Sequence, residues 1–403
     1  MNMSPVSRPV VTSVASVASV ASIALLSTLF PFTPVWADVV SDNSTGTTVN
    51  QSGNNFIING GVSNGDNVFH SFGEFNLSAD QLAKFQTLAG TENVLGRITS
   101  GDASFINGLV ELTGSNANLF LINPAGMIFG EGASLNVSGS FTATTATGIG
   151  FGDDQWFSAF GDNDYSSLSG NPNSFAFTTS HPGALVNSGN LTVSSGESLL
   201  LLGGTVINTG TLTAPGGEIT IAAIEGENLV RIGQENSLLT LELETDVAAN
   251  GGTLPTALPF TPLTLPSLLA GGPNTHATDL KLNADGSVSL TTSPEHTIPT
   301  DSGVAIASNT LSVSSNTLSI SSNSSTPPLP NSPTPQLNIL GDRTLLINAD
   351  ISADSPTNGG TIRIGGGFQG QELIFNASQT FCEGFRNFGT CRNKVIRKNG
   401  PIS

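Results

Sequence analysis

Two glycine motifs in the sequence have the spacing of loops that carry chemistry. Gly61, Ser63 and Gly65 match the nucleophile elbow, in which a serine stands between a strand and a helix. Residues 365–370 match the glycine pattern of a dinucleotide-binding loop, which also needs a following helix. Strand-like apolar sequence follows the first motif, and no helical pattern follows the second. We therefore interpret both motifs as turns.

Acidic and imidazole side chains are the other candidates for chemistry. The densest acidic group consists of Asp153, Asp154, Asp162 and Asp164. Closely spaced oxygen ligands can hold calcium, but no calcium-binding loop pattern is present, so we favour a solvated loop and keep a calcium site as the alternative. The histidines are far apart in the sequence: His70, His181, His276 and His296. None has the spacing of a metal ligand pair, so we predict no cofactor, no metal and no catalytic residue, and we interpret His70 as structural.

The charge distribution excludes one class of partner. The net charge is −18, and only 10% of the residues are charged. Five of the 12 basic residues fall in the last 18 positions: Arg386, Arg392, Lys394, Arg397 and Lys398. An acidic body without clustered basic residues argues against nucleic acid as a partner. Cys382 and Cys391 lie in the same tail, where a small disulfide loop and two thiols remain equally open.

The expected architecture follows from one stretch of the first half of the chain. Residues 119–122 form an unbroken apolar run, which is typical of a strand buried on both faces. Pro124 cannot donate to a strand ladder, and Asn123 and Gly126 tolerate the left-handed backbone of a sharp corner. A second apolar run at residues 127–129 follows too closely for a crossover helix. Short strands joined by corners predict an all-β fold, a right-handed parallel β-helix.

We expect strands or a short helix to close the N-terminal end of this coil, because bare strand edges invite aggregation. Ser78 and Gln81 have the spacing of a capping box, and Leu82 and Phe85 follow. This pattern predicts one or two helical turns at that point.

A repeat supports the coil independently of any single motif. The segment that starts at Val186 recurs at Ile207, 21 residues later, and pairs Asn187 with Asn208. The same alignment pairs Leu191 with Leu212, Gly196 with Gly217 and Glu197 with Glu218. A period near 20 residues is typical of one turn of a solenoid, and residues 346–364 have the same outline. We expect Asn187 and Asn208 to stack as an amide ladder.

The stretch around Asn123 also resembles a known family, the secretion domain at the N-terminus of filamentous haemagglutinin-like exoproteins. Residues 123–127 read Asn-Pro-Ala-Gly-Met, where the family signature is Asn-Pro-Asn-Gly-Ile, so Ala125 and Met127 depart from it. Further segments resemble the same domain in the same order: residues 69–75, 93–108 and 139–151. The resemblance covers residues 39–224.

The resemblance implies an exoprotein of two-partner secretion, which an outer-membrane transporter with periplasmic binding domains recognises and exports to the medium or the cell surface. It places the secretion motif at Asn123, Pro124 and Gly126, and we add Gly130, which stops the next apolar run. We expect these residues to shape a corner and fix the register of the first turns, a role that is both structural and recognitional. The resemblance also implies adhesion or surface attachment, with a host-surface or matrix ligand as a candidate second partner.

Two other functions remain open from the sequence. A secreted β-helical enzyme acting on polysaccharide would gather charged groups from distant turns on one face of the coil. A structural surface-layer protein would need no dedicated transporter.

Composition predicts five parts of the chain. They are residues 1–37, a signal peptide; 38–230, the secretion domain; 231–340, an insertion or linker rich in Pro, Ser and Thr; 341–370, further coil; and 371–403, an irregular basic tail. The apolar run of the first part is diluted by serine and ends in small residues before Asp38, which favours a cleaved signal over an uncleaved membrane anchor.

Overall fold

The computed structural model of the protein describes residues 38–152 and 155–231, followed by shorter segments. These are 242–244, 258–262, 279–282, 288–291, 303–307, 310–312, 335–347, 349–353, 360–365, 377–383 and 396–397. The chain divides into two compact units, Met1–Trp36 and Ala37–Ser403, and every described residue belongs to the second unit. The predicted signal peptide lies outside the described residues. Within them, no helix is long and apolar enough to cross a membrane.

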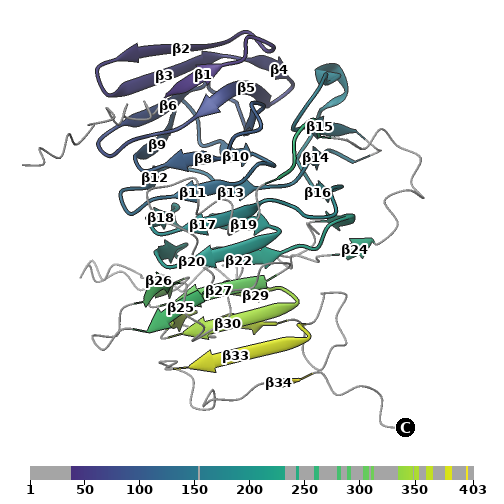
Figure 1. Cartoon of the computed structure of the whole chain (residues 1–403). Helices are drawn as coiled ribbons and strands as arrows, with labels where there is room; N and C mark the ends of the chain where they lie inside the picture. The colour runs from purple at the N-terminus through teal and green to yellow at the C-terminus, as the bar shows by residue number, and fades with distance from the viewer. Residues whose placement is uncertain are drawn as a thin grey trace, which may run out of the picture. The chain divides into compact units, whose positions relative to one another are not determined.

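The described residues form a parallel coil in which successive turns add strands to three sheets (Figure 1). The third turn shows the plan: β10 (Asn118–Ile122) joins the ten-stranded sheet A, β11 (Met127–Phe129) the eight-stranded sheet C, and β12 (Ser134–Asn136) the nine-stranded sheet B. Each of these strands pairs in parallel with strands of the turns before and after it. The predicted β-helical fold is therefore confirmed.

The other strands of the coil are as follows. Sheet A also holds β1 (Val39–Ser41), β4 (Val62–Asn64), β5 (Asn67–Phe75), β7 (Asn93–Ile98), β13 (Phe141–Thr144), β19 (Ser198–Gly203), β22 (Glu218–Ala223), β29 (Gln336–Leu340) and β32 (Thr361–Ile364). Sheet B also holds β2 (Thr47–Ser52), β3 (Asn55–Gly60), β6 (Leu82–Gln86), β9 (Leu109–Thr113), β18 (Asn190–Thr192), β21 (Thr211–Thr213), β28 (Thr310–Ser312) and β31 (Asp350–Ser352). Sheet C also holds β8 (Ser104–Ile106), β17 (Ala184–Asn187), β20 (Thr205–Asn208), β27 (Gly303–Ala307), β30 (Arg343–Ile347), β33 (Gln379–Glu383) and β34 (Ile396–Arg397).

A separate antiparallel sheet leaves the coil after β13. Its strands are β14 (Gly148–Gly150), β15 (Trp156–Ser158), β16 (Ser174–Phe177), β23 (Asn228–Arg231) and β24 (Glu242–Glu244), with the 3₁₀ helix η1 (Tyr165–Ser167) between β15 and β16. We call it sheet D. A two-stranded sheet of β25 (Asp279–Leu282) and β26 (Val288–Thr291) completes the described strands.

Sheet A is buried on both faces, which explains its unbroken apolar runs. In β10, Leu119 and Leu121 belong to the core inside the coil, because side chains alternate across a strand. Phe120 and Ile122 belong to a second cluster, which packs the outer face of sheet A against sheet D. The strand that the sequence predicts as buried on both faces is confirmed.

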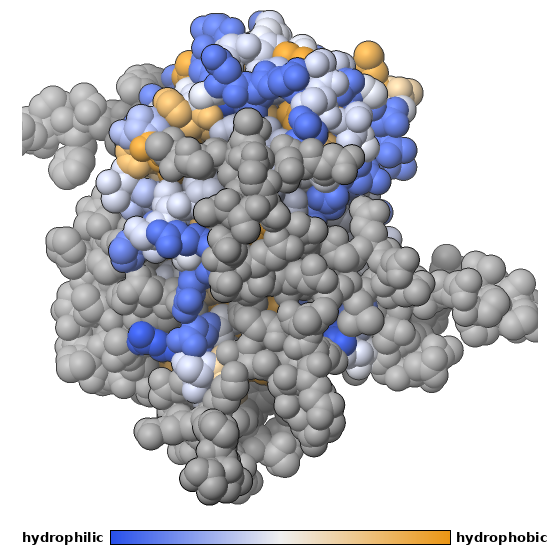
Figure 2. All heavy atoms as spheres, turned by 90° about the vertical axis from the view of Figure 1, so that its right-hand side faces the viewer, coloured by the Kyte–Doolittle hydropathy of each residue, from blue (hydrophilic) through white to orange (hydrophobic). Residues whose placement is uncertain are grey.

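Antiparallel strands close the N-terminal end of the coil, as predicted. β2 and β3 form a hairpin on sheet B, and β4 and β5 form a hairpin on sheet A. β1 also pairs antiparallel with β5, beyond β4 on the edge of β5 that faces away from β7. On the face drawn in Figure 2, the described residues at this end are mostly hydrophilic, with small separate hydrophobic spots.

The helix predicted after Ser78 is wrong. Ser78 N does donate to Gln81 Oε1 (2.7 Å), which is one of the two contacts of a capping box, but Gln81 N donates to the backbone oxygen of Ser78 (3.2 Å) and not to its hydroxyl. Moreover, Asp80 has a φ of 65°, which a right-handed helix cannot continue. Leu82–Gln86 is strand β6, with Ala83 and Phe85 buried on alternate positions. The apolar period of two determines the structure here, and the contacts between Ser78 and Gln81 close only a turn.

The predicted repeat is confirmed in its first half and shifted in its second. Asn187 lies opposite Asn208 and donates to it through Nδ2 (2.6 Å), so the amide ladder is present. Leu191 lies opposite Leu212. Glu218, however, lies opposite Ser198 and not Glu197, because the turn between β18 and β19 is one residue longer than the turn between β21 and β22.

Strands of the coil also occur inside the segment predicted to be an insertion or linker. β27 pairs in parallel with β20 and β30, and β28 pairs with β21 and β31. The sequence did not locate these two strands, because proline- and serine-rich sequence surrounds them. The boundaries between the five predicted parts remain a prediction.

Candidate functional site

The corner between β10 and β11 contains the predicted motif, and Asn123 organises it. The Asn123 side chain is fully buried. Its Nδ2 donates to Asp102 O (3.0 Å) and Ser104 Oγ (3.0 Å), both in the preceding turn of the coil. Its Oδ1 accepts from Ala125 N (3.0 Å), which closes the corner locally. One amide therefore satisfies polar groups of two successive turns.

The backbone of the corner is fixed by Pro124 and Gly126. Gly126 has a φ of 126°, which L side chains rarely adopt, and its N–H donates to Asn123 O (3.1 Å). Asn123 itself is not left-handed, contrary to the prediction, because its buried side chain needs the extended direction of the strand end to reach the preceding turn. Gly126 alone supplies the unusual backbone conformation.

Gly130 stops the next strand, as predicted, and lies against the preceding turn. A Cβ atom at Gly130 would lie 2.5 Å from Asn107 Oδ1, which is too close for any side chain. The same Asn107 oxygen accepts from Gly132 N (2.7 Å), so it caps the turn after β11. Asn107 therefore links the second corner to the preceding turn through one hydrogen bond.

The following turn of the coil packs glycines on both corners. A Cβ atom at Gly183 would lie 2.4 Å from Pro124 O, and one at Gly189 would lie 2.7 Å from Gly130 O. Neither glycine has a positive φ, so close approach of the backbones is what these positions require. The four motif residues thus lie between two turns that fit them closely.

The structure brings Asn123, Pro124, Gly126 and Gly130 together, and all four are buried. Their burial shows that a folded chain offers none of these side chains to a partner. Sequence analysis missed the residues that complete the site, which are Asp102, Ser104, Asn107 and Gly183. These residues can be identified only once it is known which turns of the coil stack on each other, since each comes from a neighbouring turn.

The two glycine motifs and His70 have structural roles. Ser63 lies in β4 of a hairpin whose next strand is β5, so the strand–serine–helix arrangement of a nucleophile elbow is not formed. Gly365 has a φ of 75° at the end of β32, and the rest of residues 365–370 lies outside the described part. His70 is buried with Nδ1 3.0 Å from Thr47 Oγ1, and burial lowers the pKa of His70 to about 4, which keeps the ring neutral near pH 7.

The structure only partly describes the acidic loop and the cysteines. Asp153, Asp154 and Cys391 lie outside the described residues. Asp164 accepts from Ser166 N (3.2 Å) and caps the 3₁₀ helix. Among the described residues, no group of three or more His, Cys, Asp or Glu side chains could hold a metal ion. Cys382 is buried in β33 within the core of the coil.

The most perturbed carboxyl group of the coil is Glu218, on the outer face of sheet A. It accepts hydrogen bonds from Thr220 Oγ1 (2.9 Å) and Asn338 Nδ2 (2.7 Å). Burial raises the pKa of Glu218 to about 7, although these hydrogen bonds and the charge of Arg363 act in the opposite direction. Glu218 and Asn338 belong to adjacent strands, β22 and β29, so this group connects two turns.

We expect the Glu218→Gln variant to be more stable than the wild type at pH 8 by about 3 kcal/mol. The folded pKa of Glu218 lies above the value of 4.5 for an unperturbed carboxyl, so the stabilisation is present below pH 4.5 and is lost as the pH rises toward 7. Glutamine keeps the neutral form at every pH. Urea unfolding at pH 4.5 and pH 8 measures the difference, and Glu74→Gln, an exposed glutamate of the same sheet, is the control. Equal gains at both pH values would contradict the assignment.

The stacked corners and the three shared sheets define the class of parallel β-helix proteins. Residues 37–259, more than half of the chain, match the family model of the TPS secretion domain. The chain therefore belongs to the TPS secretion domain family.

Comparison with solved structures gives two similar domains. The HMW1 secretion domain from Haemophilus influenzae is 20% identical, with 86% of this chain and 82% of that chain covered and a TM-score of 0.43. The filamentous hemagglutinin secretion domain is 14% identical, with 86% and 99% covered and a TM-score of 0.38. No curated protein sequence matches the chain.

Family membership establishes the general function. The chain is an exoprotein of two-partner secretion, so it is a secreted or surface protein whose export depends on an outer-membrane transporter. TPS secretion domains are non-enzymatic domains of such exoproteins.

Proposed function

We propose that the outer edge of β2 pairs with a strand of the transporter's periplasmic domains, and that the buried corner at Asn123 fixes the register of the first turns as the exported chain folds. The burial of Asn123, Pro124, Gly126 and Gly130 is the observation that carries the proposal. Residues that a folded chain hides can contact a partner only before folding. The periplasmic domains meet the chain before the coil is complete, so recognition must use another surface, one that can form without the finished coil.

β2 offers such a surface at the N-terminal end. Within the described part of the chain it is the terminal strand of sheet B and pairs only with β3. Its residues Thr48, Asn50, Gln51 and Ser52 are exposed and uncharged. A free strand edge binds a partner strand through backbone hydrogen bonds, which suits a recognition surface without charged anchors.

The geometry of the hairpin identifies which backbone groups of β2 are free. Gly53 and Asn54 form a two-residue turn, and Gly53 has a φ of 60°. Ser52 and Asn55 therefore form a hydrogen-bonded pair, and bonded and non-bonded pairs alternate along an antiparallel ladder. The N–H of Gln51 accordingly points away from β3, toward the free edge.

A pair of Gln51 variants tests the pairing. We expect Gln51→Pro to lower the amount of exported protein about tenfold, because proline removes the outward N–H, and Gln51→Ala to leave export unchanged, because alanine keeps it. Export is measured as the fraction of the chain in the medium and on the cell surface of cells that contain the transporter. Circular dichroism of the purified variants verifies that both fold. Normal export of a folded Gln51→Pro variant would refute the pairing.

After export, we propose that the folded chain acts in surface attachment, with a host-surface or matrix ligand. Membership of a family of secreted and surface exoproteins supports this role. The test is the attachment of cells that export the chain, compared with cells that carry an export-defective variant. Equal attachment would exclude the role.

We propose signal-peptide cleavage before Asp38 as the first step of export, and sequencing the N-terminus of the exported chain tests it.

A further inference from the structure

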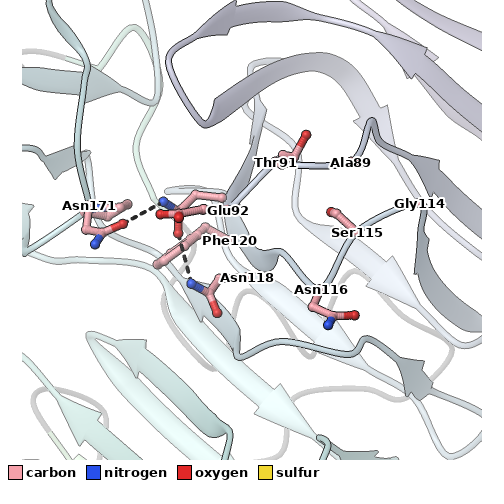
Figure 3. Close-up of a pocket in the computed structure, with 12 residues that line it drawn as sticks. Ala89, Thr91, Glu92, Gly114, Ser115, Asn116, Asn118, Phe120 and Asn171 are labelled. Atoms are coloured by element: carbon pink, nitrogen blue, oxygen red, sulfur yellow. Dashed lines mark hydrogen bonds between the residues drawn. The ribbon is translucent and has the colours of Figure 1, made fainter.

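A polar groove lies where two successive corners of the coil meet a loop of the sheet D insertion (Figure 3). The corners are those between β6 and β7 and between β9 and β10, and the loop contributes Asn171 and Pro172. The groove has a volume of about 650 Å³, within the range of small-ligand sites. It is separate from the Asn123 corner and from the edge of β2.

A ladder of amides holds the walls of this groove in place. Asn93 is buried and donates through Nδ2 to Asn67 Oδ1 (2.9 Å) and Asn171 Oδ1 (3.0 Å). Asn118 donates to Asn93 Oδ1 (3.0 Å) and accepts from Ser140 N (3.0 Å). Asn67 in turn donates to Gly170 O (2.8 Å), which anchors the insertion loop. The ladder thus fixes Asn93, Asn118 and Asn171 before any ligand binds.

Several of these groups have no partner within the described residues. They are the carboxylate of Glu92, the hydroxyl of Thr91, the amide of Asn116 and the Nδ2 group of Asn171. Figure 3 shows Asn118 and Asn171 near Glu92 and Phe120, and Ser115 and Asn116 on the neighbouring corner. The groove therefore presents both donors and acceptors over a short distance, and its one aromatic lining residue, Phe120, is only 8% exposed.

The lining excludes several ligand classes. Glu92 is the one charged lining residue, so anions such as phosphates and sulfated sugars are repelled. Strands β7 and β10 are paired on both sides, so neither has a free edge for an extended peptide. The lining also lacks the basic cluster and the exposed aromatic groove that other peptide-binding modes use.

We infer that the groove binds an uncharged saccharide. Sugar hydroxyls donate and accept at close spacing, as the free amides and the carboxylate of this groove require. The inference stands apart from the proposed pairing with the transporter, because it uses different residues and applies to the folded, exported chain.

Binding of neutral oligosaccharides to the purified chain tests this inference. The probes are maltohexaose, cellohexaose, chitohexaose and galactose-containing hexasaccharides, with a heparin-derived hexasaccharide and a lysine-rich peptide for comparison, all measured by titration calorimetry. We expect at least one neutral probe to bind, and Asn116→Ala and Glu92→Ala each to weaken it about tenfold, because each variant removes an unshared hydrogen-bonding group. Asn54→Ala, an exposed asparagine of the β2–β3 turn, should bind like the wild type.

Three results would overturn the inference. The first is the absence of binding by every neutral probe. The second is stronger binding of the sulfated hexasaccharide or the peptide than of any neutral probe. The third is binding that neither groove variant changes, since the ligand would then occupy another surface. Because Asn116 and Glu92 make no side-chain hydrogen bonds within the described residues, both variants are expected to fold normally.

Discussion

The Asn123→Val variant is expected to lose about 4 kcal/mol of unfolding free energy, because the change leaves buried polar groups of two turns without partners. Valine cannot donate to Asp102 O and Ser104 Oγ, nor accept from Ala125 N. Each unsatisfied buried group costs about 1–3 kcal/mol. Urea unfolding of the purified chain measures the loss. In cells, we expect normal synthesis and a reduced exported amount.

Asn136→Val is the matched control for this experiment. Asn136 lies in β12 of the same turn, is exposed, and donates to Glu111 Oε1 (2.7 Å) at the surface. Its loss should change stability by less than about 1 kcal/mol. An Asn123→Val variant as stable as this control would show that the corner does not depend on the buried amide.

The second large effect is expected at Gly183. In the Gly183→Ala variant, the new methyl group would lie 2.4 Å from Pro124 O and 3.2 Å from Gly126 N, so two backbones must separate. We expect a loss of about 3 kcal/mol, near the upper end for overpacking, because a backbone oxygen cannot move aside as a side chain does. Thermal unfolding and protease resistance of the purified chain measure this effect.

Gly73→Ala separates steric overlap from the general cost of replacing a glycine. Gly73 also lacks a positive φ, and the nearest atom to its added Cβ would be Val40 O at 3.9 Å. This variant should retain wild-type stability to within about 0.5 kcal/mol. Equal effects at the two glycines would rule out close contact between turns at the Asn123 corner.

The corner could be predicted from the sequence because its residue types are restrictive. A proline such as Pro124 interrupts a strand ladder, because it has no backbone N–H to donate. A glycine such as Gly126 adopts a φ that other residues avoid. The apolar run at residues 119–122 likewise indicated burial on both faces. These are local properties of the chain, so they can be seen without the fold.

The rest of the site depends on which turn stacks on which. Ser104 and Asn107 come from the turn before, and Gly183 follows an insertion that the coil must first pass. Nothing in the local sequence specifies how many residues separate a corner from the residues that pack on it. The shifted pairing of Glu218 has the same origin, since a single extra turn residue moves the register without altering the apolar pattern.

The predicted helix at Ser78 failed for a different reason. The contact from Ser78 N to the Gln81 side chain is present, but it stabilises a turn as well as a helix. The alternation of Ala83 and Phe85 into the core then determines the strand. Burial of Ala83 and the large Phe85 side chain over the preceding hairpin outweighs a local hydrogen-bond pattern.

The antiparallel closure of the N-terminal end favours folding that begins at this end and adds the turns of the coil in order. The hairpins β2–β3 and β4–β5 join neighbours in sequence, so they can form early and alone, whereas later strands need a finished layer to rest on. A chain that crosses the outer membrane with this end first would find its template already outside. Every added layer would then hold its segment there and oppose backsliding, so that folding itself would act as a ratchet for translocation.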